Sequence, residues 1–217
     1  MTPREGPGAP LLFVSEEDRA DLDAWLKRHG LQDVPLALLH PGNRRITKRG
    51  RVGRWRDDKS WPLECWAGVA CALLARDPDL RVVLSGTPKE KRLLTSIAGA
   101  VPSTRVFSAS HDLPVRRLLA LLERAVAMIS VDTGPAHAAA ALGCPLIVLY
   151  GAARPAQWLP RGPEGGTVVA IGGPPRRRRV SEISLDEVLE ALRSLPFRSP
   201  FDGPPRGLDP FIGHAQG

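Results

Sequence analysis

The chain has 217 residues, of which 43% are hydrophobic and 24% charged. These values are typical of one globular domain with short appendages. The sequence has no apolar run of about 18 residues, which excludes a transmembrane helix. Three cysteines without C-x-x-C spacing argue against a disulfide framework and against a zinc site. The first ten residues do not resemble a signal peptide, so we expect a cytoplasmic location.

The net charge of +7 is concentrated in two basic stretches. Residues 44–59 contain eight basic and two acidic residues, and Arg176–Arg179 add four arginines, while the remainder is slightly acidic. Localised basic stretches are typical of contact with an anionic partner such as phosphate, a lipid headgroup or nucleic acid. The alternative is a solvated loop in an arginine-rich composition.

Patterns in the first third of the chain predict a helix, a buried strand and a second helix, in that order. Residues 1–10 are rich in Pro and Gly and are expected to be disordered. Ser15, with Asp18 three positions on, predicts the start of a linker helix over 16–29, within 11–34, which Gly30 ends. A strand over 35–40 stops at Pro41-Gly42, a basic loop covers 43–58, and apolar periodicity predicts a helix over 63–76.

Strands and helices then alternate to the end of the predicted domain. The expected strands are 81–85, 104–107, 125–131, 145–150 and 167–171, and the expected helices are 89–98, 115–123, 135–142 and 185–195. Such alternation is typical of βαβ units in a parallel sheet. We therefore predict an α/β fold with a Rossmann-like, doubly wound parallel sheet over 11–195, followed by a Pro/Gly-rich tail over 196–217.

The most informative stretch follows the strand that ends at Val131. Ligands of open α/β sheets bind beyond the carboxyl ends of the strands. Here Asp132, Thr133 and Gly134 lead into a helix, whose start is an anion site. Gly134 allows close backbone approach to a ligand, Thr133 can cap the helix or bind a phosphate oxygen, and His137 lies in the first turn. Asp132 could accept from sugar hydroxyls or from the helix; the alternative is an ordinary capped turn.

Two more stretches that lead into helices carry candidate binding residues. Lys59, just before a helix, provides a point charge for a phosphate; the alternative is a salt-bridged loop with Trp61 as an aromatic plug. Glu90 follows Ser85-Gly86-Thr87 and could hold ribose hydroxyls, as acidic residues beside nucleotides do. The alternative for Glu90 is a first-turn acid that complements the helix dipole.

Motifs that the sequence lacks narrow the function classes. There is no G-x-G-x-x-G, Walker A or G-x-S-x-G motif and no metal-ligand spacing. This disfavours a dehydrogenase, a P-loop kinase, a serine hydrolase of that type and metal catalysis.

Four motifs in order resemble glycosyltransferase family 9, the ADP-heptose:lipopolysaccharide heptosyltransferases. They are His40-Pro41-Gly42, Asp57–Pro62, Val83–Pro88 with Glu90, and Asp132–His137 with Ala139–Pro145 and Leu149–Gly151. The resemblance covers about residues 11–195. It implies that the chain is the C-terminal, donor-binding half of a GT-B enzyme, which has two Rossmann-like domains. It also implies metal-independent, inverting transfer from ADP-heptose or a related nucleotide-sugar to a lipopolysaccharide-type acceptor, without a cofactor.

The same resemblance implies a role for each candidate residue. Lys59 would bind the diphosphate, and Asp132, Thr133 and Gly134 would contact the phosphate and sugar of the donor. His137 would lie beside them, and Glu90 would be near the adenosine ribose.

The resemblance also implies a second domain. The family's N-terminal domain carries the acceptor site and the general base, and residues 1–34 are too few to form it. We therefore assign no catalytic residue and expect a separate N-terminal acceptor domain as a partner. The stretch Arg44–Arg56 suggests peripheral contact with an anionic inner-membrane surface.

Two alternative functions remain at this point. The chain could be a non-catalytic nucleotide-binding module that kept the fold without the chemistry. It could also bind nucleic acid through its arginine clusters, but Trp55 is the one candidate stacking residue beside them, which disfavours this reading.

Overall fold

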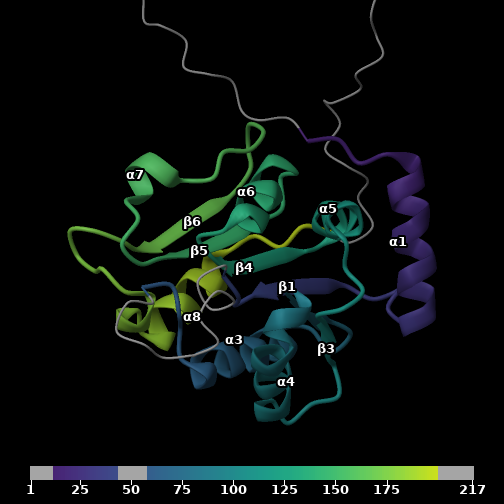
Figure 1. Cartoon of the computed structure of the whole chain (residues 1–217), viewed down its shortest axis with the longest axis horizontal. Coiled ribbons are helices and arrows are strands. Elements are labelled where there is room, and N and C mark those ends of the chain that lie inside the picture. Colours follow the sequence, from purple (N-terminus) through teal and green to yellow (C-terminus); the bar gives the residue numbers. More distant parts are fainter. Residues whose placement is uncertain (1–11, 44–57, 200–217) are drawn as a thin grey trace, which may run out of the picture.

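The computed structural model describes residues 12–43 and 58–199 (Figure 1). The predictions for residues 1–10, for most of the basic loop including Arg44–Arg56, and for the tail beyond 199 lie outside the described residues. Six strands form one parallel sheet in the order β3-β2-β1-β4-β5-β6. They are β1 (Leu36–His40), β2 (Arg81–Ser85), β3 (Val106–Ala109), β4 (Ala127–Val131), β5 (Leu146–Tyr150) and β6 (Val168–Gly172). The predicted doubly wound parallel sheet is confirmed.

Helices cover both faces of the sheet. One layer contains α3 (Leu63–Arg76), α4 (Lys91–Ala100) and α8 (Leu185–Ser194), and the other contains α1 (Glu16–His29), α5 (Val115–Arg124) and α6 (Gly134–Ala141). The short helix α7 (Pro155–Trp158) follows β5. Among the described residues, no helix is long and apolar enough to cross a membrane.

The central strands are almost entirely apolar because both of their faces are covered; His40 at the end of β1 and Ser130 in β4 are the polar exceptions. In β1, Ala37 and Leu39 pack into the hydrophobic cluster under α3 and α4, while Leu36 and Leu38 pack into the cluster under α1 and α5. All five residues of β1, β4 and β5 are buried. Continuous apolar sequence is therefore what a central parallel strand requires.

The helix that we predicted as a linker packs tightly on the domain. Ser15 and Asp18 form the expected capping box, and Gly30 ends α1 in the left-handed conformation with φ 64°. Trp25 is fully buried, and its indole N–H donates to Asp112 Oδ2 at 2.9 Å. Arg117 on α5 donates two hydrogen bonds to Asp21 on α1. These contacts attach α1 to α5 and to the loop that precedes α5.

Several predicted boundaries change in the structure. Strand β3 begins at Val106 rather than at residue 104, and the helix predicted over 89–98 is a 3₁₀ turn, Pro88–Glu90, followed by α4. Helix α7 and the 3₁₀ turn Val180–Glu182 were not predicted. Elements of three or four residues are too short to show an apolar period.

The first residues of the predicted tail are part of the packed domain. The Arg76 guanidinium lies 3.8 Å from the centre of the Phe197 ring. The Arg198 backbone N–H donates to Val126 O at 3.0 Å, and its guanidinium donates to Leu142 O at 2.9 Å. Composition alone placed Phe197 and Arg198 in a tail, whereas their side chains are fixed by contacts with distant segments.

Replacing Trp25 with alanine tests whether α1 belongs to the cooperative unit. Loss of a fully buried indole should lower the free energy of unfolding by about 3–5 kcal/mol. Phe13→Ala is the control, because that ring is 51% exposed and its loss should change stability by about 0.5 kcal/mol or less. Denaturant unfolding followed by far-UV circular dichroism measures both. Equal, small effects would show that α1 is only loosely attached.

Candidate functional site

The sheet order creates a switch point between β1 and β4. From β1 the chain continues to β2 on one side, and it later returns to β4 on the other side of β1. In doubly wound folds the connections leave such neighbouring strands in opposite directions and open a crevice at their carboxyl ends. Pro41, Gly42 and Asn43 follow β1 there, and Asp132, Thr133 and Gly134 follow β4. The predicted site residues therefore lie at the expected edge of the sheet.

Lys59 reaches the end of β4 and binds Asp132. Its ammonium lies 2.8 Å from Asp132 Oδ2 and 2.5 Å from the Asp132 backbone carbonyl. The two side chains are only 20% and 11% exposed. A partly buried ion pair of this geometry is better shielded from solvent than a surface pair. The ion pair was anticipated only as an alternative, and its partner was not predicted.

The segment that carries Lys59 is held in place by hydrogen bonds from other segments to Asp58. Asp58 O accepts a hydrogen bond from the Val180 N–H at 2.8 Å, and Asp58 Oδ2 accepts from the Ala152 N–H at 3.1 Å. A Cβ on Gly151 would lie 2.0 Å from Asp58 O, so the segment can lie this close only against a glycine. Lys59 is therefore placed by contacts with the loops that follow β5 and β6.

Trp61 fixes the other end of this segment. It is 5% exposed, its indole N–H donates to Ile183 O at 2.9 Å, and its ring packs edge-on against Trp66. The predicted aromatic plug is thus present. It packs into the core under α3 and α8.

His137 is the third member of the cluster. Its Nε2 lies 3.7 Å from Asp132 Oδ1, a distance for an ion pair rather than a hydrogen bond, and its side chain is 43% exposed. The neighbouring His137, and then Lys59, hold the pKa of Asp132 below its ordinary value, although burial acts in the opposite direction. Asp132 is therefore a stable carboxylate that two groups from different segments share.

Thr133 is the N-cap residue of α6, but its hydroxyl does not cap the helix. Its hydroxyl donates to Val131 O at 3.2 Å and lies 3.3 Å from the Ser130 hydroxyl, and no side-chain cap is present at the start of α6. Of the two roles predicted for the Thr133 hydroxyl, capping of the helix is not realised, because the side chain turns back toward β4, and binding of a phosphate oxygen stays a prediction. Helix α6 begins at Gly134, and Pro135 in its first turn has no N–H group.

Glu90 belongs to a second group of residues on the β2 side. Its Oε2 accepts from the Thr87 N–H at 2.7 Å and from the Thr87 hydroxyl at 2.9 Å, and the residue is 4% exposed. A Cβ on Gly42 would lie 2.1 Å from Oε1, so Glu90 lies against the end of β1. Among the described residues, no hydrogen bond or ion pair joins Glu90 to Lys59 or Asp132. Glu90 acts as a local cap through Thr87, a contact that neither reading of the sequence anticipated, and its role toward a ribose stays a prediction.

His40 and Ser85 form a buried pair that we did not single out as a site. His40 Nδ1 lies 3.0 Å from Ser85 Oγ, and the two residues end β1 and β2. Burial lowers the pKa of His40 below its ordinary value, although the charge of Glu90 acts in the opposite direction. The signal in the sequence was a polar residue as the last position of each of two apolar strands.

The motifs and the geometry agree with the comparisons to known proteins. A model of glycosyltransferase family 9 (heptosyltransferase) matches residues 51–184, more than half of the chain. The chain belongs to glycosyltransferase family 9. It is 34% identical to lipopolysaccharide heptosyltransferase 1 of Escherichia coli K12 over 141 residues, which cover 64% of this chain and 41% of that protein.

Solved structures of family 9 proteins share the fold. Escherichia coli ADP-heptose lps heptosyltransferase II superposes with a TM-score of 0.65 at 24% identity, over 85% of this chain and 52% of the other. Escherichia coli heptosyltransferase WaaC with ADP superposes with a TM-score of 0.57 at 26% identity, over 76% of this chain and 47% of the other. The chain therefore spans about half the length of the family 9 structures it matches.

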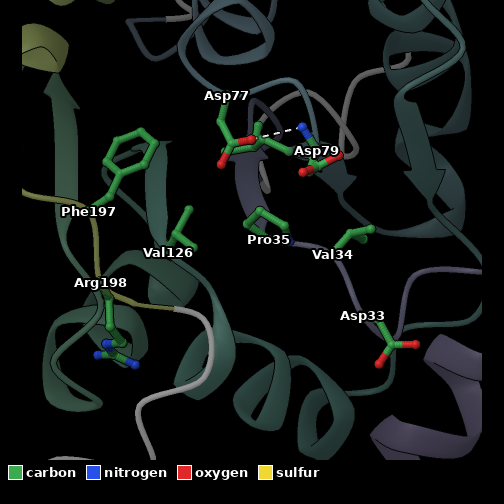
Figure 2. A pocket seen from close by; sticks show the side chains of 9 residues that line it. Asp33, Val34, Pro35, Asp77, Asp79, Val126, Phe197 and Arg198 are labelled. Carbon is green, nitrogen blue, oxygen red and sulfur yellow. Dashed lines mark hydrogen bonds between the residues drawn. The ribbon is translucent and has the colours of Figure 1, made fainter.

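A pocket elsewhere on this family 9 domain is separate from these residues. It has a volume of about 530 Å³ and lies at the opposite edge of the sheet (Figure 2). Its lining comes from the segments before β1, β2 and β4 and from the end of the described chain: Asp33, Val34, Pro35, Asp77, Asp79, Leu80, Val126, Phe197 and Arg198. None of the predicted site residues lines it. In the described part of the chain, no group of three or more His, Cys, Asp or Glu could hold a metal ion.

The buried His40 makes a testable contribution to the pH dependence of stability. Because its pKa is lower in the folded protein than its ordinary value of 6.5, the unfolded chain binds the proton more readily. The free energy of unfolding should therefore fall as the pH falls below about 6.5. His40→Asn keeps a polar group near Ser85 without titrating, so the decline should be shallower in that variant. Urea unfolding between pH 7.5 and 5 measures it; identical slopes would contradict this assignment.

Proposed function

We propose that this domain binds the nucleoside diphosphate part of an ADP-sugar, as the donor half of a heptosyltransferase-like enzyme. The observation that carries the proposal is the Lys59 ammonium, held beside the start of α6 at the switch point of the sheet. A cation and a helix N-terminus together form a site for phosphate oxygens. The WaaC structure that shares this fold was solved with ADP, which supports the choice of nucleotide.

Each predicted residue has a role in this proposal. Lys59 binds the diphosphate, and its charge with the start of α6 stabilises the leaving diphosphate as the bond to the sugar breaks. Asp132 holds Lys59 and accepts from hydroxyls of the sugar. Gly134 lets the backbone approach the phosphates, Thr133 contacts the phosphate and sugar of the donor, and His137 lies beside them.

The acceptor side of the reaction is assigned to a second domain. Inverting transfer needs a general base on the acceptor hydroxyl. We infer that the base and the site for a lipopolysaccharide-type acceptor lie on a separate N-terminal domain. A module that binds the nucleotide without transferring the sugar is the second candidate, because none of the clustered residues has been assigned as that base.

A contact with an anionic membrane surface is also proposed. The stretch Arg44–Arg56, on which the idea was based, lies outside the described residues. In the described part, Trp158 and Leu159 at the end of α7 are 57% and 42% exposed. The exposed Arg154 and Arg161 flank them. Tryptophan beside cationic groups is typical of side chains that sit at a lipid headgroup layer.

Removing the Lys59 charge tests nucleotide binding. In Lys59→Met, the affinity for ADP should fall by about 10- to 150-fold, since a hydrogen bond to a charged group contributes about 1.5–3 kcal/mol. Calorimetric titration with ADP, UDP and GDP measures the affinity and the base preference.

Two controls make this result specific. Lys27→Met removes an exposed lysine of α1 and should leave ADP affinity unchanged. Thermal unfolding of Lys59→Met shows whether the loss of the Asp132 ion pair has disturbed the fold. ADP affinity in a folded Lys59→Met protein equal to that of the wild type would refute the assignment of Lys59.

Vesicle co-sedimentation tests the membrane contact. We expect binding to phosphatidylcholine vesicles that contain phosphatidylglycerol and none to phosphatidylcholine alone. Each change of Arg154 or Arg161 to glutamine should weaken binding about fivefold, from about 1 kcal/mol per basic residue. Val115→Ala removes another exposed apolar residue, on α5, and should have no effect. Equal binding to both vesicle types would rule out an anionic-surface contact.

A further inference from the structure

The pocket at the amino edge of the sheet, where the strands begin, combines carboxylates with an apolar floor (Figure 2). Its volume of about 530 Å³ lies within the range of roughly 300–1,000 Å³ that is typical of small-molecule sites. Figure 2 shows Asp77 and Asp79 on one side of Pro35 and Val34, and Asp33 on the other side. The charged groups of the lining are therefore separated by an apolar stretch.

The three carboxylates are not balanced by cations of the protein. Among the described residues, no ion pair includes Asp33, Asp77 or Asp79. Asp33 Oδ2 accepts from the Gln32 side-chain amide at 2.8 Å, and Asp77 Oδ1 accepts from the Asp79 N–H at 2.8 Å. The pocket thus presents negative charge on a chain whose net charge is +7.

The arginines nearest to the pocket bind backbone carbonyls instead of these carboxylates. Arg198, in the lining itself, donates to the carbonyls of Glu123 and Leu142. Three further arginines donate to carbonyls of the segments that surround the pocket: Arg76, Arg81 and Arg105. These four guanidinium groups moderate the negative potential and hold the walls in place. None of their N–H groups reaches a carboxylate oxygen of the lining, so those oxygens are left to a ligand.

The spacing of the carboxylates suits an extended organic cation rather than a metal ion. In the described part of the chain, no group of three or more His, Cys, Asp or Glu lies close enough together to hold a metal. A linear polyamine carries ammonium groups separated by short methylene chains. Each ammonium group can donate to a carboxylate, and the methylene chain can lie on apolar side chains, as the stem of a lysine does. The positive charge of the rest of the protein disfavours binding of a polycation elsewhere.

We propose that this pocket binds a linear polyamine, with ammonium groups at Asp33 and at the pair Asp77 and Asp79. The methylene chain between them lies over Val34 and Pro35. The site is at the edge of the sheet opposite to the proposed nucleotide site, so it does not depend on that function. The bound polyamine joins the segments before β1 and β2, and it stabilises the folded domain because the three carboxylates come together only on folding.

Calorimetric titration with spermidine at low ionic strength tests this site. Spermidine should bind the full chain with a stoichiometry of one. Asp33→Asn and Asp79→Asn keep the size of the side chain and remove its charge, and each should weaken binding about 1.5- to 5-fold, as expected for one solvent-accessible ion pair. The double variant should weaken binding by about the product of the two factors.

Two controls separate a built site from general attraction between charges. Glu164→Gln removes an exposed carboxylate from the loop before β6 and should leave spermidine affinity unchanged. Hexaamminecobalt(III) carries the same charge as spermidine but is compact and has no methylene chain, so it should bind severalfold more weakly. Thermal unfolding confirms that each variant is folded, and spermidine should raise the Tm of the wild type more than that of the double variant.

The results that would overturn the proposal are specific. Equal spermidine affinity of the wild type and of the double variant would mean that spermidine binds outside this pocket. Equal affinity for hexaamminecobalt(III) and spermidine would show a diffuse acidic surface without a role for the apolar floor. ADP affinity should be the same in the double variant as in the wild type, so failure of the polyamine site and failure of the proposed nucleotide site can be told apart.

Discussion

The ion pair between Lys59 and Asp132 is the constraint on which the rest of this edge depends. It joins the segment before α3 to the end of β4, two parts of the chain separated by 73 positions. The lysine reaches that far only because Asp58 lies directly on Gly151 and Trp61 is anchored in the core. The loop after β4 accepts from the ammonium group, and the loops after β5 and β6 hold the neighbouring Asp58, so the cation is oriented before any ligand is bound.

The carboxyl edge of the sheet has a different character on each side of β1. On the β4 side, a cation, a carboxylate and the start of a helix lie together, which suits phosphate oxygens. On the β2 side, the buried His40 and Ser85 lie close to a carboxylate that is held by Thr87, which suits hydroxyl donors. A nucleoside diphosphate has the same two kinds of group, charged phosphates and a neutral diol, joined by a short link. The β4 side therefore matches the phosphates of the proposed ligand, and the β2 side matches its diol.

Sequence predicted local features well and long-range pairing poorly. Helix α1, helix α3 and strand β2 have the predicted bounds, because caps, glycines and apolar periods are local signals. Strand ends also located Asp132 and Glu90 at one edge of the sheet, since parallel strands share their carboxyl edge. The partner of Lys59 was not predicted, because a contact over this separation leaves no trace in local periodicity.

Other differences between the predictions and the structure have equally specific causes. Thr133 follows the usual pattern of a helix cap, but its hydroxyl contacts Val131 O and the Ser130 hydroxyl instead. Residue type alone does not decide between a capping hydrogen bond and such local hydrogen bonds. Phe197 and Arg198 are in Pro/Gly-rich sequence, yet the Arg76 side chain and the Val126 backbone hold them. The glycine after β1 indicates that some group lies close to the backbone at Gly42. Only the structure shows that this group is the Glu90 carboxylate.

The shared carboxylate also bears on how a transfer enzyme would use this site. A lysine without a counter-ion would bind a free diphosphate strongly, and tight binding of the ground state or of the product does not accelerate the chemical step. With Asp132 bound to it, the Lys59 charge is partly compensated while the donor rests in the site. As the bond to the sugar breaks, negative charge grows on the leaving diphosphate, and the attraction of Lys59 and the helix start grows with it. Under the proposed function, Asp132 thus weakens the binding of the ground state. The attraction between Lys59 and the diphosphate then increases as the transition state forms.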